Sequence, residues 1–365
     1  MFWLLIGIVA ITFGFNRVSM KYGFKNLHHM RTLSKSMVEI GEPFEVHTVI
    51  ENRKPLPVPY LRITEKFPAA LNCKGIIDER EEDGYFEFST AMFVMPYQRV
   101  KRIYSFIGNK RGYYTFRNVS LIVGDFIGLN TFSVTKYYLQ ELVVLPKVLD
   151  LDENLVPYGS YYGQVSVKRW IIDDPLMNVG IREYTGNEPE KHIHWPSSLK
   201  YGNLMVKEFD FTSEYSVNII LNVECTQPFW RGIEKDEIET CISLCRGIVE
   251  ELEKNKILYS FINNSYGGSG VTSYSSNYEN VLNILGKVSY GAAIKFETLI
   301  DSIINKREKF TTFIVVTPRI FDSYIESLER LKRNNKLILI SLDEAKLDKL
   351  SSSIIKYVRR IVPYE

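Results

Sequence analysis

Short apolar runs, partly alternating with polar residues, fill the chain between residues 36 and 148. They are PFEVHTVIENR, YLRITEKFP, YFEFSTAMFV, RVKRIYSFIG, GYYTFRNVSLIV and ELVVLPK. Val, Ile, Tyr and Phe favour strands, and the Gly, Pro and Asn residues between the runs indicate turns. The pattern predicts an antiparallel β-sandwich domain over residues 36–148. Because proline has no N–H to donate, Pro55, Pro57 and Pro59 should keep their segment out of a central strand.

After residue 216 apolar runs alternate with amphipathic segments. The runs VNIILNVE, KILYSFIN, FTTFIVVTP and KLILISLD are typical of strands buried on both faces of a parallel sheet. Helical periodicity lies between them, in residues 234–255, NVLNILGKV, FETLIDSIINKRE and SYIESLERLKRNN, and we expect a further helix at the C-terminus. The alternation predicts a doubly wound α/β domain over residues 216–365, with functional residues at the C-terminal ends of its strands. Residues 149–215 form a junction between the two domains.

The N-terminus carries an uncharged apolar stretch, FWLLIGIVAITFGF, from Phe2 to Phe15. The basic residues Arg17, Lys21, Lys25, Arg31 and Lys35 follow it, and the first acidic residue is Glu39. The stretch is shorter than the roughly 20 residues of a spanning helix, but interfacial Tyr and Lys residues extend such segments. A signal peptide would need a basic start and a cleavage motif, and neither is present. We therefore expect residues 1–24 to be a membrane anchor helix with a basic flank, rather than a buried or surface helix.

Composition narrows the range of partners and compartments. The 365 residues are 45% hydrophobic and 24% charged, as in ordinary folded chains, and the length favours two domains. The 45 basic and 43 acidic residues give a net charge of +2, which provides no overall attraction to nucleic acid. We therefore expect no nucleic-acid partner. The four cysteines (Cys73, Cys225, Cys241 and Cys245) form no CxxC pair and no disulfide framework, which indicates a reducing compartment. Together with the positive-inside rule, this places the soluble domains on the cytoplasmic side of a single-pass membrane protein.

The stretch REYTGNEPEKHIHW, from Arg182 to Trp195, concentrates residues that could perform chemistry. A metal site built on His192 and His194 would need a third and usually a fourth ligand, and the other histidines lie far away in the sequence. A nucleophilic serine at Ser197 or Ser198 would need an orienting carboxylate and an oxyanion hole, and no G-x-S-x-G motif surrounds either residue. These gaps favour a structural or interaction role over catalysis.

In the structural interpretation, Arg182 pairs with Glu183, Gly186 and Asn187 make a turn, and Trp195 anchors the segment by packing. The enzyme alternative uses His194 with Ser197 or Cys225, as in a hydrolase. It predicts a pocket in which at least two of these residues meet a carboxylate within hydrogen-bond distance. Cys241 and Cys245, four residues apart on a predicted helix, are more typical of a core than of half a zinc site.

The segment Ile181–Phe209, IREYTGNEPEKHIHWPSSLKYGNLMVKEF, resembles the hallmark LREY..GD..R.IHW..SA...L.V.EF of the domain of unknown function 58 family. The matching positions are Arg182, Glu183, Tyr184, Gly186, Ile193, His194, Trp195, Ser197, Leu204, Val206, Glu208 and Phe209. Upstream, KRGYYTFRNVSLIVGDFIGLNTF resembles the family's RG-Y stretch leading into D-P-F-G-L, and VVLPK resembles its closing V-x-P. The resemblance covers nearly the whole chain.

The resemblance implies a β-sandwich held near the membrane, followed by a domain similar to a von Willebrand factor A domain. It also implies a partnership with a MoxR-type AAA+ ATPase, in which the chain is an accessory or adaptor subunit, and it implies no enzymatic activity. We therefore expect a non-catalytic protein-interaction protein at the cell membrane. The motif residues that match the family should shape its docking surface or its domain junction.

The first strand of the α/β domain departs from a metal-dependent adhesion site. Such a site needs D-x-S-x-S after this strand, because an Asp and two hydroxyls hold a divalent cation through oxygen. The corresponding residues here are Asn222, Glu224 and Thr226, and Thr317 stands where a supporting Asp is expected. We expect a degenerate site with no metal and no cofactor. The alternative, a metal-dependent adhesion module, predicts oxygen ligands that converge on one cation near Glu224 and Thr226.

Overall fold

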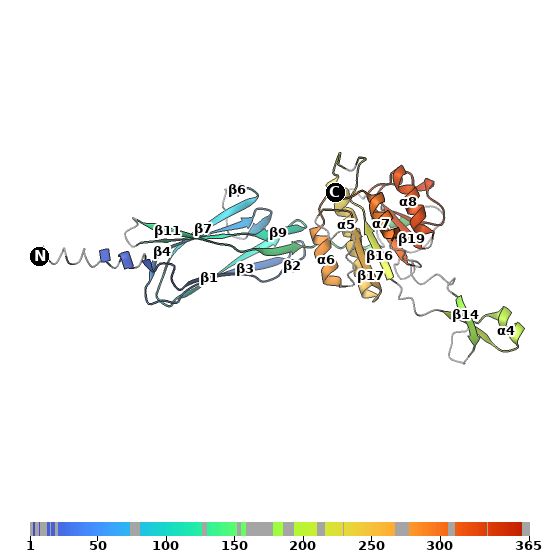
Figure 1. Cartoon of the computed structure of the whole chain (residues 1–365), viewed down its shortest axis with the longest axis horizontal. Coiled ribbons are helices and arrows are strands. Elements are labelled where there is room, and N and C mark those ends of the chain that lie inside the picture. Colours follow the sequence, from blue (N-terminus) through green and yellow to red (C-terminus); the bar gives the residue numbers. More distant parts are fainter. Residues whose placement is uncertain are drawn as a thin grey trace. The chain divides into compact units, whose positions relative to one another are not determined.

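The computed structural model divides the chain into two compact units, Met1–Lys147 and Val148–Glu365 (Figure 1). It describes residues 3, 7, 13–14, 16–18, 21–73, 81–125, 130–151, 155–157, 178–184, 193–209, 216–228, 230–266, 277–305, 311–333 and 335–359. Each unit is considered by itself below.

The first unit is built from three sheets that are almost entirely antiparallel. Their strand orders are β1-β3-β8-β5, β11-β10-β4-β7-β6 and β2-β12-β9, and the pair β2 and β12 is parallel. The strands are β1 (Leu27–Leu33), β2 (Met37–Val38), β3 (Pro43–Asn52), β4 (Val58–Pro68), β5 (Leu71–Cys73), β6 (Glu81–Glu82), β7 (Tyr85–Val94), β8 (Arg99–Gly108), β9 (Gly112–Phe116), β10 (Val119–Gly124), β11 (Thr131–Lys136) and β12 (Gln140–Val144). The expectation of an antiparallel, β-rich first half is confirmed.

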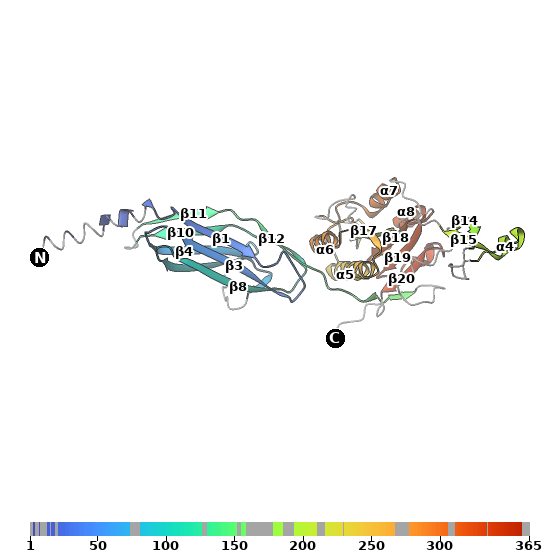
Figure 2. The ribbon, with the colours of Figure 1, turned by 90° about the horizontal axis from the view of Figure 1, so that it is seen from below.

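Two hydrophobic clusters hold these sheets face to face. One joins Leu27 and Ile50 of the first sheet to Leu61 and Leu121 of the second. The other is aromatic and includes the fully buried rings of Phe44, Phe67, Phe106 and Phe116, with Phe67 and Phe106 only 5.0 Å apart between ring centroids. Strand β3, which is labelled in Figure 2, buries every second side chain, as the period of two in its sequence predicts.

Two details of the first unit differ from the sequence analysis. Its first sheet begins with β1 at Leu27, before residue 36, and β1 pairs with β3 over its whole length. Pro59 lies in β4, which is central because β10 and β7 flank it. The expectation that the proline segment avoids a central strand is therefore wrong for Pro59. The pairing of β4 with β7 shifts register between Val58 and Leu61, and this irregularity removes the need for an N–H from Pro59.

The second unit contains a six-stranded sheet in the order β13-β20-β19-β18-β16-β17. All neighbours are parallel except β13, which is antiparallel to β20. The strands are β13 (Leu155–Pro157), β16 (Ser216–Leu221), β17 (Leu258–Asn263), β18 (Thr312–Thr317), β19 (Lys336–Ser341) and β20 (Ile355–Arg359). The strand order reverses between β16 and β18. In sheets of this type the reversal marks the place where ligands bind.

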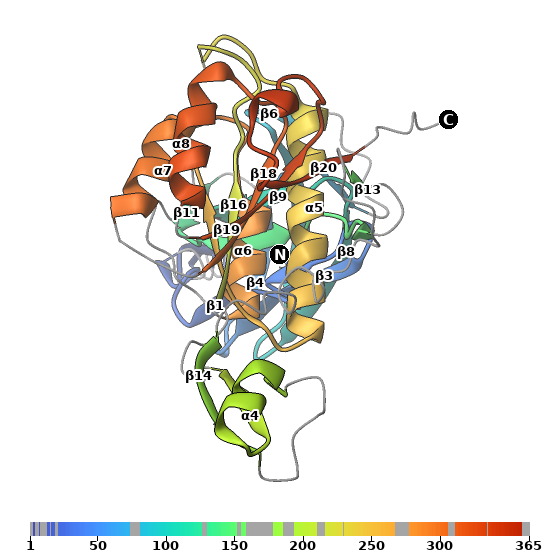
Figure 3. The same ribbon diagram turned by 90° about the vertical axis from the view of Figure 1, so that its right-hand side faces the viewer.

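Helices cover both faces of this sheet. They are α5 (Lys235–Lys254), α6 (Tyr278–Lys287), α7 (Phe296–Asn305) and α8 (Asp322–Lys332). Figure 3 shows α7 and α8 on one face and α5 and α6 on the other. The apolar sides of α7 and α8 share one core cluster with the strands, including Leu299, Ile300, Leu328 and Phe313. The α/β class predicted for the second half is therefore confirmed.

The expectation of a C-terminal helix is wrong for the described residues. After β19 the chain forms a short 3-10 helix, η2 (Leu347–Lys349), and then the strand β20. The run IIKYVR is rich in β-branched residues, which favour strands, and β20 pairs with β19 on one side and β13 on the other. In the N-terminal 24 residues the structure describes only a few helical positions, among them Trp3, Phe13 and residues 16–18. Among the residues described in the whole chain, no helix is both long enough and apolar enough to cross a membrane.

Candidate functional site

The motif from Arg182 to Phe209 forms a hairpin with a short helix. Strands β14 (Asn178–Glu183) and β15 (Met205–Phe209) pair antiparallel, with Arg182 opposite Val206 and Glu183 opposite Met205. Glu208 lies opposite Gly180 and Phe209 opposite Asn178, so both ends of the motif share one ladder. Helix α4 (Trp195–Tyr201) lies between the two strands in the sequence. Gly186 and Asn187, for which a turn was expected, and His192 lie outside the described residues.

His194 and its serine neighbours fasten α4 to the hairpin. The backbone N–H of His194 donates to the Met205 carbonyl at 2.7 Å, and its ring Nδ1 lies 2.8 Å from the Ser197 hydroxyl while capping the Ser197 N–H. The Ser198 hydroxyl accepts the Met205 N–H at 2.8 Å and donates to the His194 carbonyl at 3.0 Å. These contacts satisfy backbone groups at the start of a helix, which is a structural role.

The same element exposes large apolar side chains. Trp195 is 61% exposed, Leu199 85% and Tyr201 64%, whereas Val206 on β15 is buried. Trp195 therefore contributes surface, and the expected anchoring by packing is wrong. The expected pair between the Arg182 and Glu183 side chains is not among the described contacts. The Arg182 guanidinium donates instead to the Glu183 backbone carbonyl at 3.4 Å. Consecutive residues of a strand point to opposite faces, which separates these two side chains. Tyr184, the next motif residue, is half-buried and donates its N–H to the Leu204 carbonyl.

The residues of the enzyme alternative do not form the predicted constellation within the part of the chain that the structure describes. The described hydrogen bonds of the His194 ring go to Ser197, and none goes to a carboxylate. The Cys225 thiol lies 3.9 Å from the carbonyl oxygens of Val223 and Glu234. Burial raises the pKa of Cys225 to about 11, so its thiol remains protonated at neutral pH. Cys241 and Cys245 are buried in α5, as expected of core residues.

The carboxyl end of the parallel sheet holds a buried polar network where its strand order reverses. The Asn222 side chain, directly after β16, donates to the Thr317 hydroxyl at the end of β18 at 3.0 Å. Its Oδ1 accepts the Glu224 N–H at 3.0 Å and the side-chain amide of Asn264 at 2.8 Å. Asn264, which follows β17, also accepts the Val223 N–H at 2.9 Å. Three neighbouring strand ends are thereby joined.

Glu224 connects this network to two helices. Its Oε1 accepts the Phe296 N–H at the start of α7 at 2.6 Å, and its Oε2 accepts the Tyr324 hydroxyl of α8 at 2.5 Å. Glu224 is 3% exposed, and burial raises the pKa of its carboxyl group although both donors act in the opposite direction. The first turn of a helix favours a carboxylate, so α7 supports the charged form. Burial also raises the pKa of Tyr324, which remains a hydrogen-bond donor.

These residues do not fit a cation site of the adhesion type. The oxygen ligands of a hard cation must be free to point at it, but the Asn222 and Glu224 side-chain oxygens already accept hydrogen bonds from protein donors. Thr226 belongs to a separate contact set, in which its hydroxyl lies between Pro228 and Gly232. Within the described residues, no group of three His, Cys, Asp or Glu side chains has the arrangement of a metal site.

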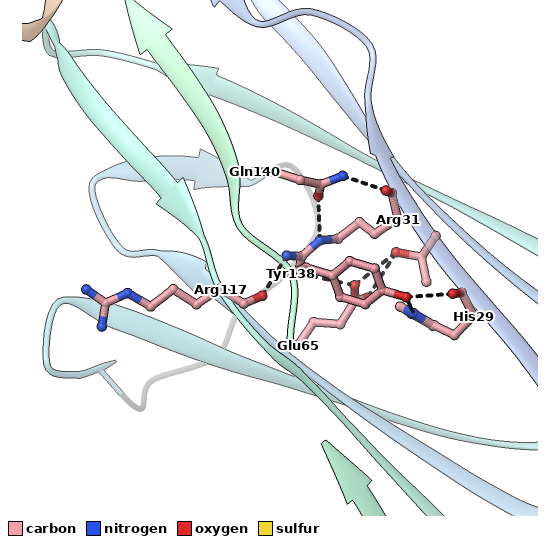
Figure 4. A network of polar contacts seen from close by, with 7 residues as sticks. His29, Arg31, Glu65, Arg117, Tyr138 and Gln140 are labelled. Atoms are coloured by element: carbon pink, nitrogen blue, oxygen red, sulfur yellow. Dashed lines mark hydrogen bonds and ion pairs between the residues drawn. The ribbon is translucent and has the colours of Figure 1, made fainter. Parts of the chain in front are cut away.

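The first unit also contains a buried network, called the first network after its unit, which the sequence analysis missed (Figure 4). Arg31 of β1 donates from Nε to Gln140 at 2.9 Å and from Nη2 to the Arg117 carbonyl at 2.6 Å. Its Nη1 lies 3.8 Å from Oε1 of Glu65, and both side chains are almost completely buried. The Thr48 hydroxyl lies 3.0 Å from the same Glu65 oxygen. The network therefore contains one cation and one anion.

Aromatic residues complete this first network. The Tyr138 hydroxyl donates to the His29 carbonyl at 2.6 Å and lies 3.1 Å from the His29 ring Nδ1. The Arg31 guanidinium stands 5.6 Å from the Tyr138 ring centroid, within cation–π range. Burial lowers the pKa of His29 to about 4, with Lys136 and Arg31 adding to the effect. The signal in the sequence was the alternation in β1, which puts His29 and Arg31 on the same face as Leu27.

Comparison with known proteins gives no family. No protein-family model matches the chain, and no curated protein matches it. Among solved structures, the CARDB domain of PF1109 from Pyrococcus furiosus is 12% identical over 33% of this chain and 94% of that chain, with a TM-score of 0.20. The ASH / PapD-like domain of human CEP192 (PapD-like domain 7) is 12% identical over 32% of this chain and 84% of that chain, with a TM-score of 0.19. Function must therefore be inferred from the residues of this chain.

Proposed function

We propose that this chain is a non-catalytic protein-binding protein whose docking surface is the hairpin element β14–α4–β15. The observation that supports this most is the exposure of Trp195, Leu199 and Tyr201 on a helix whose backbone is fastened by His194 and Ser198. Large exposed aromatic residues on a hydrogen-bonded support are typical of the centre of a protein interface. A catalytic role has no comparable support, because the described side-chain contacts of His194, Ser197 and Cys225 include no carboxylate.

The partner that we propose is a MoxR-type AAA+ ATPase, with the chain as its accessory or adaptor subunit. This part of the proposal rests on the resemblance of Ile181–Phe209 to the domain of unknown function 58 family. The same resemblance suggests that the second unit is similar to a von Willebrand factor A domain in which hydrogen bonds around Asn222 and Glu224 replace the cation. It also suggests attachment to the cell membrane through the N-terminal residues 1–24, with both units on the cytoplasmic side.

The proposal is tested by affinity capture with the full chain from native lysate, with and without ATP and Mg²⁺, read by mass spectrometry. We expect a MoxR-type AAA+ ATPase to be recovered in a nucleotide-dependent manner. The variant Trp195→Ala/Leu199→Ala should weaken its binding at least roughly 30-fold, because central aromatic residues contribute about 2 kcal/mol or more to an interface. Folding should be unchanged, since both side chains are exposed.

The matched control removes a comparable exposed pair from the first unit. Tyr137 is 82% exposed and Leu139 is 73% exposed, so Tyr137→Ala/Leu139→Ala deletes a similar apolar area that does not belong to the hairpin element. Binding of the ATPase should survive this change. If no AAA+ ATPase is recovered with the unaltered chain, the proposed partner is wrong. If both double variants bind the ATPase equally well, the proposed docking surface is wrong.

A further inference from the structure

One end of the first unit is tied to the N-terminal segment by hydrogen bonds. We call it the anchor-proximal end and define it by residues 16–18, 21–26, 51–57 and 95–99, with Asp125. Asn16 donates to the Asp125 carboxylate at 3.1 Å, and the buried Lys54 ammonium donates to the Tyr22 carbonyl at 2.9 Å. Asn52 joins the other loops, because its side chain donates to the Met95 carbonyl and its N–H to the Gln98 carbonyl. The loops of this end are therefore held as one surface.

This end exposes apolar and aromatic side chains. Tyr97 is 70% exposed and Met95 56%, on a loop in which Tyr97 adopts a positive φ of 53°. Tyr22 is 36% exposed, and the ammonium groups of Lys21 and Lys25 lie 5.9 and 5.3 Å from its ring centroid. Aromatic rings flanked by lysines are characteristic of segments at a membrane–water interface.

Charge distinguishes this end from the opposite one. The side chains of the anchor-proximal end that are charged at neutral pH are Arg17, Lys21, Lys25, Arg53, Lys54 and Arg99, against Glu51 and Asp125. At the opposite end, the described turns around residues 35–42, 83–84 and 108–112 hold Lys35, Lys110 and Arg111 against Glu39, Glu42 and Asp83. The excess of positive charge is therefore local, in a chain with a net charge of only +2. A local basic excess beside exposed aromatics matches the charge of an anionic lipid surface.

We propose that the anchor-proximal end of the first unit rests on an anionic membrane surface, with Tyr97 and Met95 inserted at the headgroup level and Lys21 and Lys25 facing the lipid phosphates. The inference rests on the proposed membrane attachment of residues 1–24, with which this surface is continuous through Asn16. The contact fixes the orientation of the first unit, whose opposite end then faces away from the bilayer.

The experiment places one fluorophore at each end of the first unit in the full chain. Cys73→Ser provides the background, because Cys225, Cys241 and Cys245 are buried and Cys73 is only half-buried. Tyr97→Cys and Lys110→Cys are each labelled with a nitrobenzoxadiazole group, which keeps an apolar ring at position 97. The labelled chains are reconstituted into phosphatidylcholine vesicles with or without phosphatidylserine, and quenching by spin-labelled lipid is measured.

We expect strong quenching at position 97 in vesicles that contain phosphatidylserine, weaker quenching at high salt, and none at position 110. Adding Lys21→Ala and Lys25→Ala, which leaves Arg17 and the Arg53–Glu51 ion pair in place, should lower the docked-to-undocked ratio roughly 25-fold, because each basic residue near an anionic surface contributes roughly fivefold.

Two results would overturn the inference in different ways. If the chain floats with the vesicles but position 97 is quenched no more than position 110, the docking of this end is wrong while the membrane attachment stands. If the chain does not float with vesicles of either composition, the membrane attachment and the docking both fail. Quenching at position 97 that is equal in both lipid mixtures and insensitive to salt would contradict the electrostatic part of the inference.

Discussion

The two units each bury a polar network, but they compensate its charge differently. In the first unit the buried carboxylate of Glu65 faces the guanidinium of Arg31, so the network contains a cation and an anion. In the second unit the donors within hydrogen-bond distance of Glu224, among the described residues, are all dipolar: the Tyr324 hydroxyl, the Phe296 N–H and the Asn264 amide. Burial raises the pKa of both carboxyl groups.

This difference shows two ways of keeping a carboxyl group inside a protein. An ion pair requires that neither partner be lost, because the remaining charge would be buried alone. A shell of neutral donors lets the carboxyl group take up a proton instead. The stability of the unit then depends on pH. Substitutions at Arg31, His29 and Tyr324 test this difference between the units, with the largest effect expected at Arg31.

Arg31→Met should destabilise the first unit by about 3–5 kcal/mol, because it leaves Glu65 buried without its cation. The methionine side chain keeps much of the apolar stem volume of the arginine. Urea denaturation of the full chain, followed by hydrogen exchange in β1 and β3, measures the free energy of unfolding of this unit separately from the other.

The matched control for this change is Arg31→Met combined with Glu65→Gln. The glutamine removes the unpaired charge and can still accept the Thr48 hydroxyl hydrogen bond. A substantial part of the lost stability should return. A double variant that is no more stable than Arg31→Met alone would show that packing, and not the buried charge, determines the loss.

His29 should make the first unit less stable in acid. Its pKa falls from 6.5 to about 4 on burial, so the neutral ring is favoured in the folded state. The resulting stability is fully present above pH 6.5 and is lost as the pH falls towards 4, by roughly 3 kcal/mol in total. Urea denaturation of the first unit at pH 7.5, 5.5 and 4.5 should show this decline, and His29→Gln should flatten it.

The neighbouring His28 is exposed on the other face of β1 and supplies a control. His28→Gln should leave the pH dependence of the first unit as steep as in the unaltered chain. A decline that persists in His29→Gln would assign the acid sensitivity to other groups.

Tyr324→Phe should destabilise the second unit by about 2 kcal/mol at neutral pH, because it removes a hydrogen bond to a buried carboxylate. The ring remains, so its contact with Phe296 at 4.8 Å between centroids is kept. The raised pKa of Glu224 means that its protonated form is favoured in the folded state, and the stability from this preference is lost as the pH rises through the folded pKa. The Tyr324 hydrogen bond opposes this rise in pKa by stabilising the charged form, so its loss costs more where the carboxyl group is ionised. The variant should therefore lose more stability at pH 8 than at pH 4.5, as measured by hydrogen exchange in β16 and α8.

Glu224→Gln tests whether the carboxyl group is the origin of that pH dependence. The amide oxygen can accept one of the same donors and does not titrate. The second unit of this variant should show a smaller change in stability between pH 4.5 and 8 than the unaltered chain. An unchanged dependence of stability on pH would mean that a group other than Glu224 titrates.

The sequence predicted the elements of both units because each has its own period of apolar residues. It also located Asn222, Glu224 and Thr317 at strand ends, where the structure joins them through hydrogen bonds. It could not predict the part played by Asn264 or Tyr324, because that depends on which strands are neighbours and on how α8 packs. The exposure of Trp195 was missed for the same reason, since a tryptophan in a motif does not reveal which side of its helix is covered.

The first network was missed because Arg31 was counted with the basic flank of an apolar N-terminus. A cluster of positive residues beside an apolar segment is a strong compositional signal, and it concealed the weaker alternation of β1. Its partners Glu65, Tyr138 and Gln140 come from distant strands, so the sequence alone offered no reason to group them. The C-terminal strand β20 was missed because a local pattern does not show that β19 and β13 would pair with it on either side.

The two sides of the first network lie far apart in the sequence. This separation affects when the first unit can fold during synthesis of the chain. His29 and Tyr138 are 109 residues apart, and so are Arg31 and Gln140. At roughly 5–20 residues per second, the ribosome needs about 5–20 s to supply Tyr138 and Gln140 after β1 itself has been made. During that interval Arg31 and Glu65 must stay hydrated, and the sandwich cannot close over them. Folding of the first unit therefore has to wait for β12, whatever the rest of the chain has already formed.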